Sequence, residues 1–397
     1  MALLDDARTH QDDLVQLRRT LHREPELGLQ LPRTQERVLA ALDGLPLDIT
    51  TGESLTSVTA VLHGTADGTR KSVLLRGDMD ALPVAERSGS EFAATGENMH
   101  ACGHDLHVSM LVGAARVLSE KRDRLAGDVV FMFQPGEEGY DGAAHMVKEG
   151  VLDATGRRAD AAFALHVTSG MLPAGLFATR PGPVMSAADV LRVTVRGAGG
   201  HGSSPHRAKD PIPAACEMVT ALQTFVTRRF DIFDPVVITI GAFHSGTQHN
   251  VIPDEAYFEA TVRSFSHESH ARILAESQQV CRGIAAAHGL EVDAECAELY
   301  PVTINTAAEV AAVEAMVADV HGEGRYLELP NPVAGSEDFS RVLDAVPGAM
   351  VFLGATLPER DPSTAPFNHS PEAAFDDAVL SDGVALYAEF ALRTLHG

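Results

Sequence analysis

The sequence has no long apolar runs. No run of apolar residues approaches the roughly 18 that a membrane-spanning helix needs. Residues 1–8 contain no long apolar stretch of the kind found in secretory signals. Cysteine is scarce, and its scattered positions do not have the spacing of a disulfide framework: Cys102, Cys216, Cys281 and Cys296. We therefore expect a cytoplasmic protein with no membrane partner.

Positive charge is also scarce. The chain has 31 lysines and arginines against 55 aspartates and glutamates, which gives a formal net charge of −24 at pH 7. Such a chain repels nucleic-acid phosphates and anionic lipids, so we expect no nucleic-acid partner. Hydrophobic residues make up 45% of the 397 residues, enough for a sizeable core. The length suggests two domains, or one large domain with an insertion.

Between residues 56 and 165, short apolar runs alternate with helical patterns. This alternation predicts a largely parallel sheet that is covered on both faces. Ligands of open α/β sheets bind outside the carboxyl ends of the strands. Three successive runs end in acidic or imidazole side chains, which predicts a functional site there: Asp78 and Asp80, then Glu137 and Glu138, then His166.

The pattern changes at about residue 186. Residues 189–196 and 256–265 alternate with period two, which favours an antiparallel sheet with one wet face, and helical patterns fill residues 211–228 and 267–288. After residue 300 the first pattern returns, with helical spacing over 307–321, an apolar run at 349–353 and a closing helix over 373–395. We expect an α/β fold in which a mostly parallel-stranded catalytic domain is formed by residues 1–185 and 299–397. An α+β satellite domain, residues 186–298, is inserted in it.

The stretch Met99–His107 concentrates potential metal ligands. It reads Met-His-Ala-Cys-Gly-His-Asp-Leu-His and runs directly into an amphipathic helical pattern. A thiol, imidazoles and a carboxylate in such a loop are suited to holding a metal ion rather than to building a core. With the strand ends and a late histidine, the candidate ligands are Cys102, His104, Glu138, His166 and His369, with Asp78, Asp80, His100 and His107 in reserve.

These donors are more than one ion uses, so they predict two divalent ions that share one bridging ligand. Thiolate and imidazole favour Zn²⁺, while imidazole and carboxylate also accept Mn²⁺, Co²⁺ or Ni²⁺. Glu137 and Glu138 are expected to differ in role, because adjacent residues of an extended chain point to opposite sides. One would bind metal. The other would act as general base toward a water whose pKa the metal lowers towards about 7.

Two other segments have simpler explanations. His22–Leu27 is a tempting site but also fits the end of a helix that is broken before Pro25. Gly197–Gly202 matches the Gly-x-Gly-x-x-Gly pattern of dinucleotide sites. However, the strand before it alternates, whereas a dinucleotide-binding strand is buried on both faces. We therefore expect no nucleotide site.

Taken together, the motifs make the chain resemble the M20 metallopeptidase family. They resemble most closely its amidohydrolase subfamily of hippurate hydrolases, N-acyl-amino-acid deacylases and auxin-conjugate (IAA-amino-acid) hydrolases. The Cys-Gly-His motif selects the subfamily, because most other M20 branches have an aspartate bridge. The matching segments lie in the family's order along nearly the whole chain: 77–83, 99–105, 134–139, 165–166, 200–202, 249–253, 335–339 and 368–370.

The resemblance implies roles for individual residues. Cys102 would bridge two metal ions, with the other four candidates as the remaining ligands. Glu137 would be the general base and acid, and Asp80 would orient a ligating histidine. The satellite domain would form a homodimer. His201 and Asn250 would then bind substrate in the partner's active site, and Arg263 would grip a substrate carboxylate.

These last three residues also have structural explanations, since a polar turn or a sheet surface accommodates them without any function. The expected activity is metal-dependent hydrolysis of the amide bond of N-acyl amino acids, and Tyr140 is a candidate for acyl selectivity. The alternatives are a dipeptidase or aminopeptidase of the same superfamily and a catalytically inactive metal-binding interaction protein. The presence of Glu137 argues against the inactive form.

Overall fold

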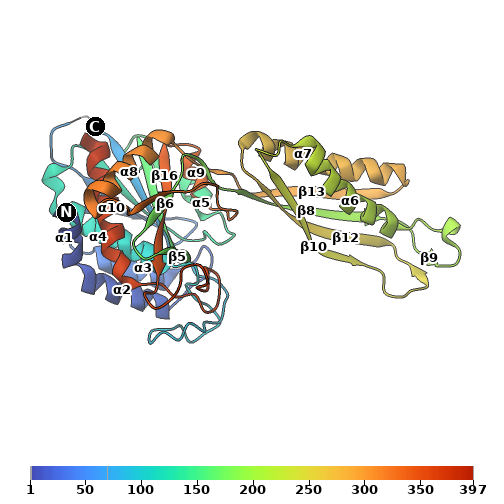
Figure 1. Cartoon of the computed structure of the whole chain (residues 1–397), viewed down its shortest axis with the longest axis horizontal. Helices are drawn as coiled ribbons and strands as arrows, with labels where there is room; N and C mark the ends of the chain where they lie inside the picture. Colours follow the sequence, from blue (N-terminus) through green and yellow to red (C-terminus); the bar gives the residue numbers. More distant parts are fainter. Residues whose placement is uncertain (1, 69, 397) are drawn as a thin grey trace. The chain divides into compact units, whose positions relative to one another are not determined.

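The computed structural model describes residues 2–68 and 70–396, which form two compact units (Figure 1). Unit 1 contains the described residues up to Val184, residues 304–331 and the chain from Arg341 onward. Unit 2 contains Met185–Thr303 and the short segment Pro332–Ser340. The short segment is tied to the start of the insertion, because the backbone N–H of Ser186 donates to the carbonyls of Val333 (3.2 Å) and Gly335 (2.9 Å).

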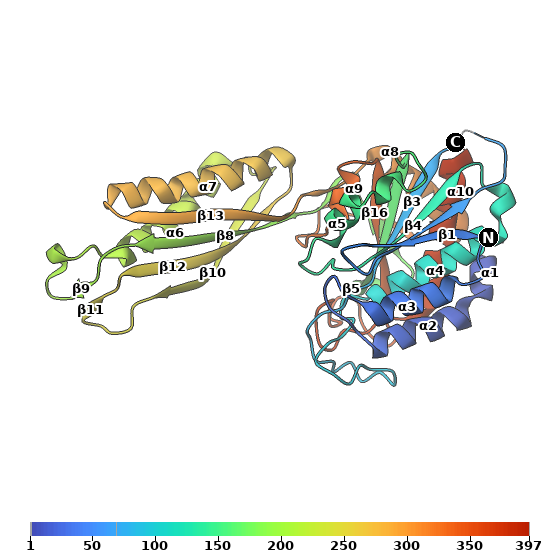
Figure 2. The same ribbon diagram turned by 180° about the vertical axis from the view of Figure 1, so that it is seen from behind.

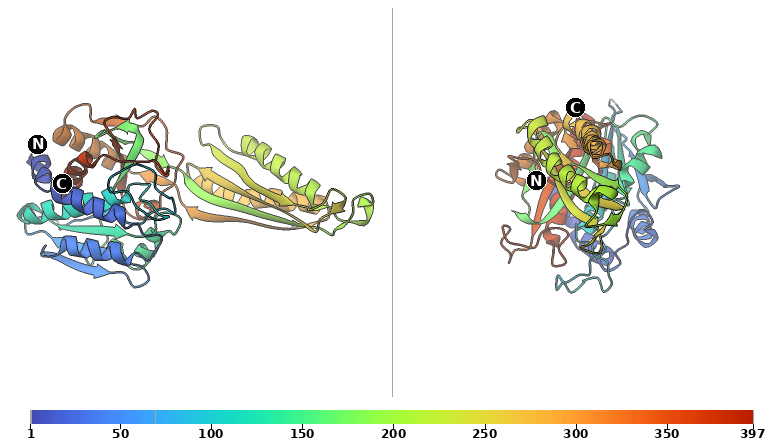
Figure 3. Two further views of the ribbon diagram at one scale, coloured as in Figure 1. Left: turned by 90° about the horizontal axis from the view of Figure 1, so that it is seen from below. Right: turned by 90° about the vertical axis from the view of Figure 1, so that its right-hand side faces the viewer.

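The amino-terminal part of unit 1 is helical, with a break between Arg23 and Pro32. Figure 3 shows the first helix beside the last one, and the two pack against each other. The three helices are α1 (Ala2–Thr9), α2 (Gln11–Arg23) and α3 (Pro32–Leu42).

The core of unit 1 is an eight-stranded sheet in the order β1-β2-β4-β3-β5-β16-β6-β15. Four neighbouring pairs are parallel (β3/β4, β3/β5, β5/β16, β6/β15), while β1/β2, β2/β4 and β6/β16 are antiparallel. Every residue of β3 and β16 is buried, so both faces of these strands are covered. The strands are β1 (Leu47–Thr51), β2 (Val58–His63), β3 (Ser72–Asp78), β4 (Asp128–Gln134), β5 (Ala161–Pro173), β6 (Phe177–Thr179), β15 (Tyr326–Glu328) and β16 (Gly348–Thr356).

Helix α4 (His104–Glu120) starts at the predicted ligand loop, but it is buried almost all round rather than amphipathic. It packs against strands β3, β4 and β5 and also against the helices α2, α3 and α10. Its contact with α10 is close: a Cβ atom added to Gly113 would lie 2.4 Å from Cγ2 of Val384. A helix enclosed in this way needs apolar residues on all faces, and any polar residue on it needs a partner.

Two further elements differ from the sequence-based expectation. Strand β5 continues well past His166, because its parallel pairing with β16 extends through Val167 and Thr168. Helix α10 begins at Leu380 instead of 373, because the side chain of Asp376 accepts from the backbone N–H of Ala378 and starts a 3₁₀ turn. The remaining elements of this part are η1 (Arg122–Arg124), α5 (Gly142–Lys148), η2 (Val151–Asp153), β7 (Gly182–Met185), β14 (Thr303–Asn305), α8 (Ala307–His321), α9 (Ser340–Leu343), η4 (Asp377–Val379) and α10 (Leu380–His396).

Unit 2 is built on an antiparallel sheet in the order β10-β12-β8-β13. The predicted alternation is present: Leu191, Val193 and Val195 of β8 are buried, while the residues between them face outward. Helices α6 and α7 cover the buried face (Figure 2). The elements are β8 (Ala187–Arg196), β9 (Gly200–His201), η3 (Pro205–Arg207), α6 (Pro211–Arg229), β10 (Val236–Ser245), β11 (Val251–Ile252), β12 (Glu255–Ser264), α7 (His267–Ala287) and β13 (Glu291–Tyr300).

Within residues 2–68 and 70–396, every helix is too short or too polar to cross a membrane.

Candidate active site

The structure brings the five predicted ligands together in unit 1. Cys102 precedes α4, His104 is its first residue, Glu138 lies in the turn after β4, His166 lies within β5, and His369 lies in the loop between β16 and α10. Two groups of three have their donor atoms within 4.8 Å of one another, Cys102–His104–His166 and Cys102–Glu138–His369. The Cys102 sulfur belongs to both groups, so it occupies the position of a shared ligand.

Individual distances support this arrangement. The Cys102 sulfur lies 3.5 Å from Nε2 of His166 and 3.2 Å from Nε2 of His369. Oε1 of Glu138 lies 3.2 Å from Nε2 of His369 and 3.9 Å from Nε2 of His104. Because these atoms converge from four separate segments, the site depends on the tertiary fold and not on the local sequence alone.

The residues present fit a pair of divalent cations. Both ring nitrogens of His104 are buried, and they hydrogen-bond to no described residue. Buried polar atoms without partners are costly, and an ion or a water would satisfy them. The donors are one thiolate, three imidazoles and one carboxylate, a set that suits Zn²⁺ and accepts Mn²⁺, Co²⁺ or Ni²⁺.

The electrostatics of the site also favour cations. Burial raises the pKa of the Cys102 thiol, but the charge of His166 and the hydrogen bonds from neighbouring histidines lower it well below its usual value. Burial and the charge of Cys102 raise the pKa of Glu138. Hydrogen bonds to Cys102 and Glu138 raise the pKa of His369 to about 10. A thiol that ionises easily among imidazoles is suited to cations, because metal ligands bind in their deprotonated forms.

The tautomer of His166 follows from its surroundings. Its Nδ1 lies 2.9 Å from the carbonyl oxygen of Val167, which can only accept. Nδ1 therefore carries a proton and donates it, so Nε2, which faces Cys102, is the ring nitrogen left to bind a cation. A backbone carbonyl in this position fixes the ring orientation of a ligating histidine.

Asp80 links the two acidic residues to helix α4. Its Oδ1 accepts from the backbone N–H of Glu137 and its Oδ2 from that of Glu138, both at 3.0 Å. Oδ1 also lies 3.5 Å from Nδ1 of His104. The side chain thus holds the Glu137–Glu138 turn and faces a candidate ligand at the same time.

Glu137 and Glu138 occupy a turn after β4, not an extended chain. The premise that their side chains diverge as in a strand is therefore wrong. One carboxylate oxygen from each residue lies within 4.8 Å of a His104 nitrogen and of the other oxygen. Glu138 additionally reaches His369, so it contacts two of the other candidate ligands. This difference favours Glu138 as the ligand and leaves Glu137, which is 6% exposed, beside the cation positions.

His107, which the sequence suggests only as a reserve ligand, has a supporting role in the structure. Its Nε2 accepts from the backbone N–H of Val167 at 2.8 Å, so Nδ1 must carry the proton and donate to Oδ1 of Asp78 at 2.6 Å. Oδ2 of Asp78 accepts from Nη1 of Arg76 at 2.7 Å. This network leaves no donor atom of His107 available for metal and fastens the strand that carries His166 to α4. Its signal in the sequence is a histidine on a helix that is otherwise apolar, since a buried polar group needs partners.

His100, another reserve ligand, belongs to none of the ligand groups formed by described residues. Burial lowers its pKa to about 3, so it is neutral. It lies beside His22, with ring centroids 6.2 Å apart.

The segment from His22 onward does more than end helix α2. Nδ1 of His22 bonds Oδ2 of Asp105 (2.8 Å), and Nε of Arg18 pairs with the same oxygen (2.7 Å). Glu26 binds the first turn of α3, and its carbonyl accepts from Ala81 at 2.8 Å. The interpretation as a simple helix end was therefore incomplete. The segment contacts the residues that follow Asp80 and His104.

Replacing Arg18 by leucine is expected to lower the free energy of unfolding by about 3–5 kcal/mol near pH 7, because the buried Asp105 would lose its guanidinium partner and keep only His22. Burial opposes ionisation of Asp105, but Arg18 and His22 hold its pKa well below the usual range. A lowered carboxyl pKa stabilises the fold above the unfolded-state value of about 3.9, and this contribution is lost as pH falls below it. The difference in the free energy of unfolding between Arg18→Leu and the wild type should therefore become smaller at acid pH.

Urea unfolding of the wild type and of Arg18→Leu, at pH 7 and at acid pH, measures this difference in stability. Arg19→Leu is the matched control, because Arg19 is 38% exposed and pairs with Asp377 near the surface. It should cost less than about 1 kcal/mol. Equal stabilities for Arg18→Leu and the wild type would contradict the prediction.

The three predicted substrate-binding residues lie in unit 2. His201 is the last residue of β9 and Asn250 directly precedes β11; both are exposed, and next to this antiparallel pair the N–H of Gly202 donates to the carbonyl of Asn250 at 2.8 Å. Arg263 is half-buried on β12, and its Nη1 is covered and bonds to no described residue. Burial lowers its pKa, while the charge of Asp189 opposes that shift.

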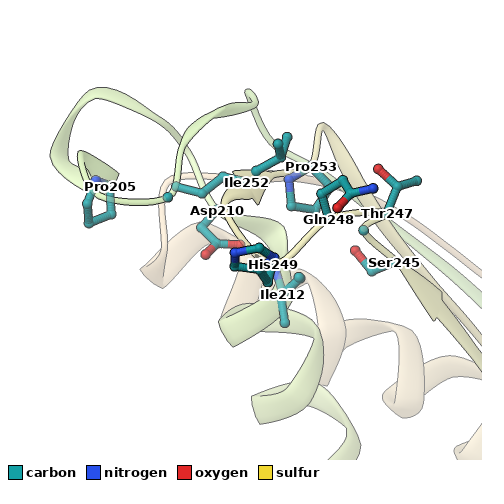
Figure 4. Close-up of a pocket in the computed structure, with 12 residues that line it drawn as sticks. Pro205, Asp210, Ile212, Ser245, Thr247, Gln248, His249, Ile252 and Pro253 are labelled. Atoms are coloured by element: carbon teal, nitrogen blue, oxygen red, sulfur yellow. Dashed lines mark hydrogen bonds between the residues drawn. The ribbon is translucent and has the colours of Figure 1, made fainter.

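A hollow of about 530 Å³ borders the β9/β11 pair (Figure 4). It is lined by the start of α6, by the loop Ser245–His249 and by Ile252 and Pro253. The only carboxylate labelled there, Asp210, is occupied in capping α6 through the N–H of Ile212. All five candidate ligands lie in unit 1, so this pocket is not the metal site.

A buried, mostly parallel sheet beside which one thiolate, three imidazoles and two carboxylates converge defines a metal-dependent hydrolase. The chain belongs to peptidase family M20/M25/M40, whose sequence profile matches residues 74–393. It is accordingly a metal-dependent amidohydrolase, as predicted from its motifs. The fold class expected from the sequence, a mostly parallel α/β sheet with an additional antiparallel sheet, is also confirmed.

Similar proteins agree with this assignment over the whole chain. Thermostable carboxypeptidase 2 of Saccharolobus solfataricus is 36% identical over 396 residues, covering 98% of both chains. N-acetylcysteine deacetylase of Bacillus subtilis is 33% identical, covering 96% of this chain and 97% of the relative. The crystal structure of the Bacillus subtilis YxeP protein, a dinuclear metal-binding peptidase from the M20 family, superposes with a TM-score of 0.82 at 30% identity. It covers 98% of this chain and 99% of that chain.

Proposed function

We propose that the protein hydrolyses the amide bond of N-acyl amino acids, releasing a carboxylic acid and an amino acid. The observation that carries the proposal is the pair of ligand groups that share Cys102, with the Glu137 carboxylate beside them. The resemblance to N-acetylcysteine deacetylase supports this substrate class, because that relative's name describes removal of an acyl group from an amino acid.

In this proposal Cys102, His104, Glu138, His166 and His369 hold two divalent cations, Zn²⁺ or Mn²⁺, with Co²⁺ or Ni²⁺ as further candidates. Bound cations would lower the pKa of water and polarise the scissile carbonyl. Glu137 accepts the proton of the attacking water and delivers it to the leaving nitrogen. Asp80 keeps that carboxylate in place through its bonds to the two backbone N–H groups.

Unit 2 supplies the remaining proposed groups. His201 and Asn250 would bind the carbonyl of a substrate held by the partner in a homodimer, and Arg263 would pair with the substrate carboxylate. The covered, unbonded Nη1 of Arg263 supports an anionic partner, since such a donor is costly when left unpaired. Strand β10 is a sheet edge with exposed Val237 and Phe243, which supports association of two copies there. Sedimentation analysis tests the dimer, and the expected cytoplasmic location stays a prediction.

Incubation with hippurate and a panel of N-acetyl amino acids, with Mn²⁺ or Zn²⁺ supplied, should release free amino acid. Dipeptides with a free amino group form the comparison set, because the carboxypeptidase relative favours a peptidase as the second candidate function. If only dipeptides are cleaved, the activity is that of a peptidase. A protein that holds its full complement of metal but is inert towards every N-acyl substrate would refute the proposal.

A further inference from the structure

The side chain of Asn368 joins the segments that carry the candidate metal ligands. It lies next to His369 in the loop between β16 and α10 and is half-buried. Its Oδ1 accepts from the backbone N–H of Ser169 (2.9 Å) and from the Ser169 hydroxyl (3.2 Å). Its Nδ2 donates to the carbonyls of Val167 (3.0 Å) and Cys102 (3.2 Å) and lies 3.7 Å from the Cys102 sulfur.

The orientation of this amide is determined by its partners. The backbone N–H of Ser169 can only donate, so it must face the amide oxygen. The carbonyls of Val167 and Cys102 can only accept, so they must face the amide nitrogen. An aspartate at this position would have the same outline but would turn an acceptor towards two carbonyls and a thiolate. Only an amide satisfies both sides of the position at this length.

The same contacts have a consequence for the cation positions. The Val167 carbonyl that accepts from Asn368 is also the one that orients His166, so the amide holds the peptide next to that ligand. On the Cys102 side, an N–H group near the sulfur stabilises the negative charge of the thiolate and orients its lone pairs. The amide therefore acts on Cys102 and His166 together.

The third ligand segment is strained and needs support. His369 has a backbone φ of 72°, which is unfavourable for any residue other than glycine. Its N–H donates to the carbonyl of Ala101 at 2.9 Å, and Asn368 directly before it is fastened to Cys102 and Ser169. These bonds hold the loop in the conformation that turns His369 towards Cys102.

We propose that Asn368 is a positioning residue that sets the placement and charge of the Cys102 bridge and ties His166 and His369 to it. The inference rests on the two-cation site of the proposed function. It assigns to Asn368 no contact with substrate. Loss of its donor should weaken cation binding, as loss of groups that support metal ligands does, by about 10- to 100-fold.

The test compares Asn368→Asp with Asn305→Asp. Asn305 is the control in unit 1, because its buried amide likewise donates to three described residues, none of them a candidate ligand: Thr179 (2.8 Å), Arg180 (3.1 Å) and Met350 (3.1 Å). Each variant is stripped of metal, and Zn²⁺ affinity is measured by competition with a chromophoric chelator. The Co²⁺-loaded forms give the thiolate-to-metal charge-transfer absorption, which reports on the Cys102 sulfur.

Asn368→Asp should bind at least one Zn²⁺ about 10- to 100-fold more weakly than wild type and shift the charge-transfer band. Asn305→Asp should leave the Zn²⁺ affinity and the charge-transfer band unchanged, even if it lowers thermal stability. If Asn368→Asp does not fold, Asn368→Ala removes the donor without adding charge and should show a smaller loss in the same direction. Unchanged affinity and absorption in the folded Asn368 variant, or equal losses in both positions, would overturn the proposal.

These readouts separate this proposal from the proposed function. Wild-type protein that binds two ions but cleaves no N-acyl amino acid contradicts the substrate assignment and leaves the role of Asn368 measurable. Wild-type protein that binds fewer than two ions overturns both. Wild-type protein that binds two ions and is active, with an Asn368→Asp form of equal affinity, overturns the role of Asn368 alone.

Discussion

Replacing Glu137 by glutamine should lower kcat by about 10²- to 10⁴-fold while the bound metal is retained. Glutamine keeps the size of the side chain but cannot accept a proton, so only proton transfer is removed. The backbone N–H of Glu137, held by Asp80 at 3.0 Å, is unaffected by the change. Steady-state kinetics on an N-acyl amino acid, with metal content measured by mass spectrometry, gives both quantities.

Glu138→Gln provides the counterpart to this variant. Glu138 lies between His369 (3.2 Å) and His104 (3.9 Å), so its loss should reduce metal content first and activity as a consequence. If the results are reversed, with metal lost in Glu137→Gln and retained in Glu138→Gln, the two residues have exchanged roles. Full activity of Glu137→Gln would exclude it as the general base.

Replacing Cys102 should lower activity at least as strongly as replacing Glu137, but through loss of bound metal. In Cys102→Ala both ligand groups lose a member at once, so we expect both ions to bind weakly and activity to fall to background. Cys102→Asp should restore part of the metal binding and part of the activity, because a carboxylate can also bridge two cations. Metal stoichiometry after dialysis and turnover with saturating metal are the measurements.

Cys216→Ala is the control, because Cys216 is exposed in unit 2 and outside every ligand group of the described chain. It should keep the metal content and the rate of the wild type. A Cys102→Ala protein that still holds two ions with wild-type affinity would show that Cys102 is not the shared ligand.

The sequence predicted the parallel sheet, the inserted antiparallel sheet and the convergence of the five candidate ligands. These succeeded because buried strands, alternating strands and ligand-bearing strand ends leave local patterns. The length of β5 and the start of α10 were missed. Pairing with β16 extends the first, and the cap formed by Asp376 delays the second. Neither cause is visible in the local sequence.

The supporting side chains were harder to predict than the ligands. His107, Asp105 and Asn368 act through contacts with residues 29 to 266 positions away, and such contacts have no periodic signature. A signal in the sequence exists for two of them, because a charged or imidazole side chain on a helix that is buried almost all round must find a partner. Asn368 offers no comparable signal, since amides are ordinary in loops.

The position of β16 in the sheet has a consequence for synthesis on the ribosome. This strand lies between β5 and β6, yet it emerges only after the whole insertion that forms most of unit 2. Until Gly348–Thr356 is available, a nascent chain presents the unpaired side of β5, and His369 is still missing. Such an open strand edge can pair with other chains. The sheet of unit 2 is complete at Tyr300 and can form earlier, so chaperone protection matters most for the half-finished sheet that carries the candidate ligands.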